Sequence, residues 1–147
     1  MDAAAHYRLG QCIAEATGQH RVVLIASGDL SHKLSGSSYG TVPEGAEFDR
    51  AVTEALGCGD FLALFNIPED LRKCAGECGY YSLMVLAGCF DRRGVEAKFL
   101  SYEGPFGVGY AVAGFMPYRK PSSSILISTT GSTDFRPIAE YICPTLP

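Results

Sequence analysis

The sequence predicts an α/β fold in which a central strand is covered by helices on both faces. Two observations support this: several segments carry apolar residues at helical spacing, and one short run, "RVVLIAS" at residues 21–27, is apolar and rich in β-branched residues. Such a run is typical of a strand in a parallel sheet with two buried faces. The 147 residues, 47% hydrophobic and 19% charged, are enough for one domain with its own core.

The first half of the chain is expected to alternate helix, strand and loop. Helical spacing predicts an opening helix over about residues 3–17, which Gly18 then ends. The strand at residues 21–27 follows, and the Gly, Ser and Pro of residues 35–45 are typical of a loop. Residues 46–56, "AEFDRAVTEAL", repeat apolar residues with the spacing of an amphipathic helix.

The second half is expected to contain three helices and a hairpin. Asp60 suits the N-cap of a short helix through Phe65, and Pro68 suits the first turn of another. Residues 80–90, "YYSLMVLAGCF", are apolar on nearly every side and predict a deeply buried helix. A hairpin follows, with "GPFG" as its loop. Its two strand-like stretches are "VEAKFLSYE" at residues 95–103 and "VGYAVAGFM" at residues 108–116.

Composition sets limits on the class of protein. Residues 1–116 are expected to fold, whereas residues 117–147 are rich in Pro, Ser and Thr and predict a linker or an extended tail. A net charge of -4 does not favour nucleic acid as a partner. No apolar run approaches the roughly 20 residues that span a bilayer, so we expect a soluble, cytoplasmic protein. Six scattered cysteines without a CxxC spacing favour free thiols.

His32 is the first candidate for a functional residue. It lies in "IASGDLSHKL", just beyond the predicted central strand, and open α/β sheets bind ligands outside the carboxyl ends of their strands. An imidazole titrates near neutrality, so it can take and return a proton at working pH. The alternative is a histidine on a surface loop or at a helix cap, and position alone leaves both interpretations open.

Other patterns carry less information about chemistry. "GDLS" is only a permutation of the Gly-Asp-Ser-Leu esterase motif, and Ser31 beside His32 does not by itself make a nucleophile. "GPFGVG" leads into a strand instead of a helix, which disfavours a phosphate-binding loop. Glu77, in "KCAGECGYYS", precedes a buried helix, where a carboxylate commonly stabilises the helix N-terminus.

Four ordered blocks nevertheless resemble one known family. The blocks are "VVLIASGDLSHKL", "GAEFDRAVTEAL", "AGECGYYSLMVLAG" and "FLSYEGPFGVGYAV", and they cover roughly residues 21–113. Together they resemble the LigB-type class III extradiol ring-cleavage dioxygenases, in the branch of the AmmeMemoRadiSam system and Memo-like proteins. The resemblance implies the C-terminal half of a three-layer sandwich, with a central mixed, mainly parallel sheet and helices on both faces.

The resemblance also implies roles for individual residues. In that family a ferrous ion is held by two histidines and one glutamate, and a further histidine acts as acid/base on the substrate. By motif, His32 of "SGDLSH" matches the acid/base and Glu77 of "ECG" matches the carboxylate ligand, while Tyr39, in the loop after His32, is a candidate substrate-binding residue. His6 and His20 lie outside the family's ligand motifs, so the iron site of this chain is expected to be incomplete.

The expected function is therefore that of part of a domain. The resemblance implies a non-haem Fe(II)-dependent extradiol dioxygenase that cleaves a catechol-like substrate with O2, with the full-length domain active and this chain alone inactive. Expected partners are a missing N-terminal half or a second copy of the chain. The alternative is a non-catalytic, Memo-like interaction or scaffold subunit, because a shared fold does not settle the reaction.

Overall fold

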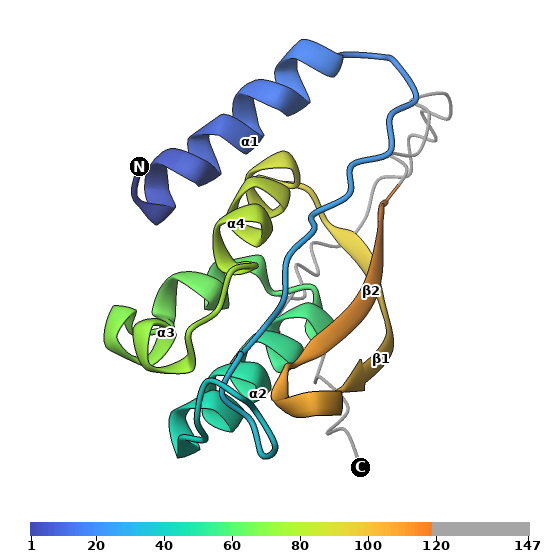
Figure 1. The fold of residues 1–147 in the computed structure, drawn as a ribbon. Coiled ribbons are helices and arrows are strands. Elements are labelled where there is room, and N and C mark those ends of the chain that lie inside the picture. Colours follow the sequence, from blue (N-terminus) through green and yellow to red (C-terminus); the bar gives the residue numbers. More distant parts are fainter. Residues whose placement is uncertain (119–147) are drawn as a thin grey trace, which may run out of the picture.

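The computed structural model of the chain describes residues 1–118. Figure 1 shows a group of helices packed against one side of a β-hairpin. The elements in chain order are α1 (Ala3–Thr17), α2 (Pro43–Cys58), the 3-10 helix η1 (Phe61–Asn66), α3 (Glu69–Ala75), α4 (Tyr80–Cys89), β1 (Val95–Glu103), the short 3-10 turn η2 (Pro105–Gly107) and β2 (Tyr110–Pro117). The helices and the hairpin lie where the sequence predicts them.

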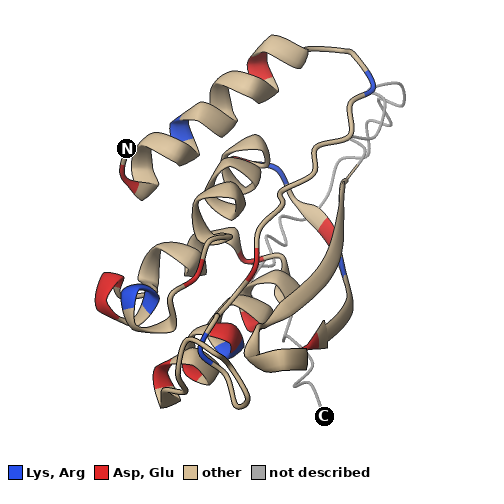
Figure 2. Cartoon of the chain, in the orientation of Figure 1, with Lys and Arg blue, Asp and Glu red and all other residues tan. Residues whose placement is uncertain are grey.

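Local signals explain where these helices begin. The Asp2 side chain accepts a hydrogen bond from Ala5 N at 2.8 Å and caps α1. The Asp60 side chain caps η1 by accepting from Ala63 N at 3.2 Å, as predicted. In α3 the acidic residues lie in the first turn and the basic residues in the last (Figure 2). That order complements the helix dipole.

The core lies between α2, α4 and the inner face of the hairpin. Tyr80 is buried at the start of α4, where its hydroxyl donates to Leu64 O at 3.0 Å. Phe61 stacks on Phe90, with ring centroids 5.4 Å apart, and meets Phe115 of β2 edge-on at 4.9 Å. The prediction that residues 80–90 form a deeply buried helix is confirmed. Its buried apolar residues are Tyr80, Leu83, Met84, Leu86 and Ala87.

The sheet contains two strands among the described residues. β1 and β2 are antiparallel, with Val95 opposite Pro117 and Glu103 opposite Tyr110, and a bulge between Phe99 and Ser101. The inward side chains pack on the helices. The outward side is exposed, with large apolar side chains at Leu100, Val112 and Met116.

Residues 21–27 do not form the central strand that the sequence predicts. They run extended past α4 (Figure 1), yet they make no backbone hydrogen bond with other described residues. Val23 is 86% exposed and Ile25 is 81% exposed. A strand exists only where a neighbouring strand supplies hydrogen-bond partners. The backbone bond to the hairpin comes after this segment, where Leu30 N donates to the O atom of Gly109, the residue before β2, at 2.9 Å. The described residues thus form a mixed α and β fold with an antiparallel hairpin, and not the predicted three-layer arrangement around a mainly parallel sheet.

Two further predictions concern the C-terminal stretch and membrane-spanning segments. The Pro-, Ser- and Thr-rich stretch beyond residue 118 lies outside the described residues, so the predicted boundary after residue 116 stays a prediction. Within residues 1–118, no helix combines the length and the apolar character that a bilayer span requires.

Candidate functional site

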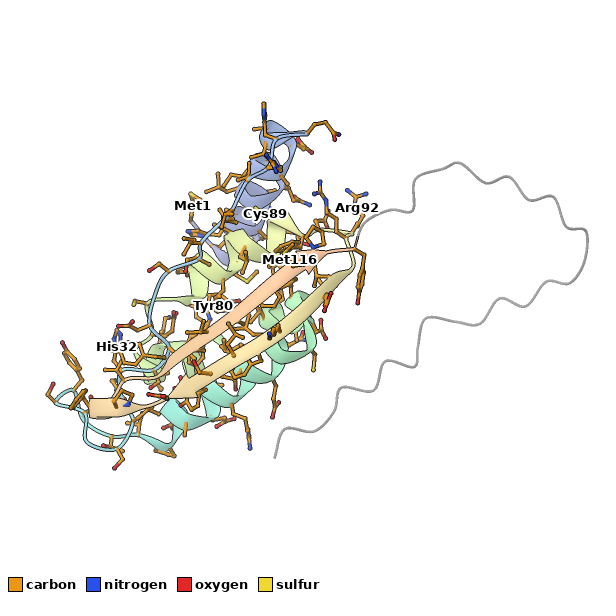
Figure 3. The ribbon with its side chains drawn as sticks, turned by 90° about the vertical axis from the view of Figure 1, so that its right-hand side faces the viewer. Met1, His32, Tyr80, Cys89, Arg92 and Met116 are labelled. Atoms are coloured by element: carbon orange, nitrogen blue, oxygen red, sulfur yellow. The ribbon has the colours of Figure 1, made fainter. Side chains whose placement is uncertain are left out.

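The candidate site lies where residues 29–32, which follow the exposed segment of residues 21–27, meet the loop between α3 and α4. Asp29 O accepts hydrogen bonds from Cys78 N at 3.3 Å and from Gly79 N at 2.9 Å. On the other side, His32 N donates to Ala75 O at 3.1 Å. These backbone bonds fix residues 29–32 against residues 75–79, although the two stretches are far apart in the sequence. The site is near one end of the molecule, while Cys89 and Arg92 lie toward the other (Figure 3).

Glycines allow this close approach. Gly28 has a φ of +156°, and a Cβ built there would overlap the backbone of Gly79. A side chain at Gly79 would in turn overlap Asp29 O. The glycines of "SGD" and "ECG" therefore bring the polar residues beside them into contact.

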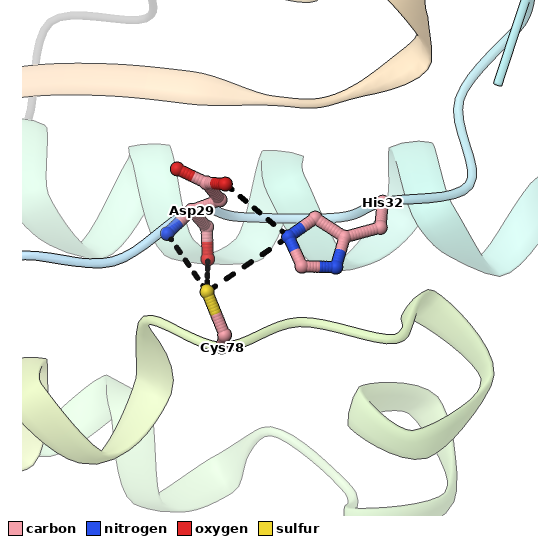
Figure 4. A group of neighbouring side chains, drawn as sticks. All are labelled: Asp29, His32 and Cys78. Carbon is pink, nitrogen blue, oxygen red and sulfur yellow. Dashed lines mark hydrogen bonds and ion pairs between the residues drawn. The ribbon is translucent and has the colours of Figure 1, made fainter. Parts of the chain in front are cut away.

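Three polar side chains converge where residues 29–32 contact residues 75–79 (Figure 4). His32 Nε2 lies 3.4 Å from Asp29 Oδ2 and 3.8 Å from Cys78 Sγ. The backbone N–H of Asp29 also donates to Cys78 Sγ at 3.2 Å. One ligand atom from each residue lies within 4.8 Å of the other two, and Cys78 is exposed, so the group is open to solvent.

Glu77 has a structural role beside this group. Its Oε2 accepts a hydrogen bond from Tyr80 N at 2.7 Å, which caps the N-terminus of α4 as the alternative interpretation of the sequence expected. Burial raises the pKa of Glu77, and the Tyr80 N–H bond and the charges of Arg72 and His32 act against that rise. Glu77 therefore interacts electrostatically with His32. Its role as a metal ligand stays a prediction.

The remaining predicted residues occupy different places. The ring of Tyr39 is tilted against His32, with centroids 6.1 Å apart, and its side chain is exposed, so it lies beside the group without enclosing it. Its role in substrate binding stays a prediction. His6 stacks on Tyr81 at 4.4 Å within the α1 and α4 pair, and His20 is exposed after the end of α1. Neither belongs to the convergent group.

The sequence analysis did not single out Asp29, and it did not place Cys78 beside His32. Asp29 precedes His32 by three residues and Cys78 follows Glu77 directly, so both lie inside the motifs already singled out. Cys78 is a free thiol, as are Cys12, Cys74 and Cys89. Cys58 is disulfide-bonded, so the prediction of free thiols is wrong for that residue.

The donor atoms suit a divalent transition metal. An imidazole nitrogen, a carboxylate oxygen and a thiol sulfur form a mixed set of the kind that holds iron, cobalt or zinc, and the sulfur disfavours magnesium and calcium. Three protein ligands leave positions open for substrate. The set differs from the two histidines and one glutamate that the resemblance implies, because the described residues bring only one histidine to this place.

Comparison with known proteins agrees with the resemblance. Residues 1–113 match the family model described as the catalytic LigB subunit of aromatic ring-opening dioxygenase. The chain is also 38% identical over 122 residues to the protein CA_C1420 of Clostridium acetobutylicum. That match covers 81% of this chain but 26% of the relative, so the chain spans about a quarter of the relative's length. Because the family match extends over most of the chain and includes every residue of the convergent group, the chain belongs to the LigB family of aromatic ring-opening dioxygenase subunits.

Proposed function

We propose that this chain supplies the proton-transfer side of a non-haem Fe(II)-dependent extradiol dioxygenase site that acts on a catechol-like substrate and O2. The observation that carries the proposal is the convergence of His32, Asp29 and Cys78 in a chain of the LigB family. In the full domain, residues 21–27 would be a central strand of a three-layer sandwich, since their composition suits burial on both faces.

His32 is the proposed acid/base. Asp29 Oδ2, at 3.4 Å from Nε2, holds the ring and favours a proton on that nitrogen. Nδ1 has no hydrogen bond within residues 1–118, so it is the nitrogen that can take a proton from a substrate hydroxyl and return it. Proton transfer by a positioned imidazole contributes typically about 10²–10⁴-fold to a rate.

Besides Asp29, whose carboxylate lies in the convergent group, two residues of this chain are proposed to contribute to the metal site. Glu77 matches the family's carboxylate ligand, and while one of its oxygens caps α4 the other is left to bind. Cys78 already lies beside His32 with an exposed sulfur. Bound Fe(II) would act as a Lewis acid that makes the substrate hydroxyls more acidic and orients the reactants.

Metal titration with single variants tests these roles. We expect the 147-residue chain to bind one Fe(II) under anaerobic conditions, measured by native mass spectrometry. Glu77→Ala and Cys78→Ala should each weaken binding by about 10-fold or more, since each removes a ligand. His32→Ala should leave Fe(II) binding unchanged and lower catechol-dependent oxygen uptake in any assembled form that shows it.

Matched controls make the outcome decisive. Cys12→Ser changes an exposed thiol on α1, away from the site, and should bind Fe(II) like the unmodified chain. Unchanged Fe(II) affinity in both Glu77→Ala and Cys78→Ala would reject the ligand assignment. Loss of Fe(II) in His32→Ala would instead make His32 a ligand and remove its acid/base role.

A second candidate function rests on the exposed apolar segment. Large exposed apolar surface marks sites of protein association, and Val23 and Ile25 are almost fully exposed. The same fold could therefore serve as a non-catalytic, Memo-like interaction or scaffold subunit. Absence of Fe(II) binding together with stable association would favour this function over the first.

A further inference from the structure

We propose that Asp49 is a positioning residue for this site: its buried carboxylate holds Ser31, and through Ser31 it holds Asp29 and His32 in contact with Cys78. Asp49 lies on α2 and belongs to neither the acid/base nor the ligand set. The inference deepens the proposed function and rests on it for its catalytic meaning.

Asp49 is a buried carboxylate with two defined partners. It is 1% exposed. Its Oδ1 accepts a hydrogen bond from Ser31 N at 2.7 Å, and its Oδ2 accepts one from the Tyr102 hydroxyl at 2.7 Å. A buried carboxylate is costly unless such bonds satisfy it, so its position is tightly determined. The carboxylate joins three elements, because Ser31 follows the exposed segment and Tyr102 lies on β1.

Ser31 uses its other polar groups inside the protein as well. Its hydroxyl donates to Ala75 O at 3.1 Å and accepts from Lys33 N at 3.0 Å, while Ser31 O accepts from Gly109 N at 2.8 Å. Ser31 is fully buried. It is thus the anchor of this stretch, which explains the serine beside His32 without a nucleophilic role.

The anchor controls the geometry of the convergent group. Asp29 and His32 lie on either side of Ser31 in the chain, whereas Cys78 belongs to the loop before α4. A backbone shift at Ser31 would move Asp29 and His32 and weaken the backbone bonds that join them to Ala75, Cys78 and Gly79. Asp29 and Cys78 each offer a donor atom to the candidate metal site, so separating them should weaken metal binding even though His32 is not a ligand. Removing a partner that orients metal-site residues typically weakens metal binding by about 10–100-fold.

Asp49→Ala is the main test, with Co(II) as the metal probe. Two measurements are made on each protein: Co(II) affinity, and NMR hydrogen exchange at the amides of His32, Cys78 and Gly79. These amides donate the backbone hydrogen bonds that join residues 29–32 to residues 75–79. We expect Asp49→Ala to lower Co(II) affinity by about 10–100-fold and to speed exchange at these amides, with exchange in α4 unchanged. Asp49→Asn keeps an oxygen for Ser31 N and should restore both properties.

Two further variants keep the test interpretable. Thr53→Val changes another buried polar residue of α2 and should leave both measurements unchanged. Among residues 1–118, the Thr53 hydroxyl bonds to Arg50 O of the same helix and not to the site. Tyr102→Phe removes one of the two bonds to Asp49 and should lower Co(II) affinity by about threefold. If Asp49→Ala does not fold, Asp49→Asn and Tyr102→Phe still decide the question.

The outcomes separate this inference from the proposed function. Unchanged affinity and exchange in a folded Asp49→Ala protein would overturn the positioning role and leave the metal site standing. If Asp49→Asn lowers Co(II) affinity and speeds amide exchange as much as Asp49→Ala does, the effect comes from loss of the negative charge. That result would also overturn the positioning role. If the unmodified chain binds no Co(II) but Asp49→Ala still speeds exchange at the three amides, the positioning role stands and the proposed function fails.

Discussion

At the scale of single residues, burial and hydrogen bonding have opposite effects on the pKa of Asp49. Burial raises its pKa above 3.8, and the bonds from Tyr102 and Ser31 act in the opposite direction without cancelling the rise. Burial also raises the pKa of Tyr102, and its hydrogen bond to Asp49 raises that pKa further. The raised pKa keeps the hydroxyl of Tyr102 protonated at neutral pH, so Tyr102 is the donor in its bond to Asp49.

A pH dependence of stability follows from the raised pKa of Asp49. A carboxyl group whose pKa is higher in the folded state stabilises folding below its unfolded value, and that contribution disappears as the pH rises through the folded value. The free energy of unfolding, relative to Asp49→Asn, should therefore fall as the pH rises from below 3.8 toward neutrality. Urea unfolding of both proteins across this pH range measures the difference. A constant difference would mean that the pKa of Asp49 is the same in the folded and unfolded states.

At the scale of elements, α1 and α4 cross with their backbones in close approach. Gly10 on α1 and Gly88 on α4 face each other, and a Cβ at Gly88 would overlap the carbonyl oxygen of Tyr7. Polar bonds flank the crossing, since the Tyr7 hydroxyl and Gln11 both donate to the carboxylate of Asp91, each at 2.9 Å. Close backbone packing and polar bonds thus both hold α1 to α4.

Gly88→Ala tests this crossing. The added methyl group cannot fit without separating the helices, so we expect a loss of about 1–3 kcal/mol in the free energy of unfolding, measured by urea titration. Gly57→Ala is the matched control, because a Cβ there meets open space inside α2. That variant should gain about 0.5–1 kcal/mol from its higher helix propensity. Equal effects at both positions would contradict the close crossing.

At the scale of the whole molecule, the described residues leave apolar surface uncovered. The segment from Val22 to Ile25 presents both apolar side chains and unpaired backbone groups, and the outward side of the hairpin adds Val112 and Met116. An extended, uncharged segment of this kind readily pairs with another strand. The proposed partners are a second copy of the chain or the remaining part of a LigB domain.

Association should therefore depend on this segment. We expect light scattering to show a mass that increases with concentration, and the double variant Val23→Lys with Ile25→Lys to shift the protein toward the monomer, because charge disfavours strand pairing. Leu62→Lys, at an apolar residue of η1 that is 63% exposed, is the control and should associate like the unmodified chain. A monodisperse monomer at every concentration would contradict self-association.

The sequence by itself determined the helices, the hairpin and the two motifs. The hydrogen bonds of a helix join residues four apart, and caps such as Asp2 and Asp60 act within three residues, so a short window of sequence contains the information. The hairpin is equally local, because its loop joins adjacent strands. The same holds for His32 and Glu77, which were recognised from the few residues around each of them.

Only the tertiary structure decided how the site is built. Asp29, His32 and Cys78 converge because backbone bonds join residues 29–32 to the loop before α4, although Asp29 and Cys78 are separated by 49 positions in the sequence. Asp49 likewise accepts a hydrogen bond from Ser31 N, at a separation of 18 positions in the sequence. Whether residues 21–27 form a strand also depends on neighbours far away in the chain. Such contacts follow from packing, which no local pattern of residues encodes.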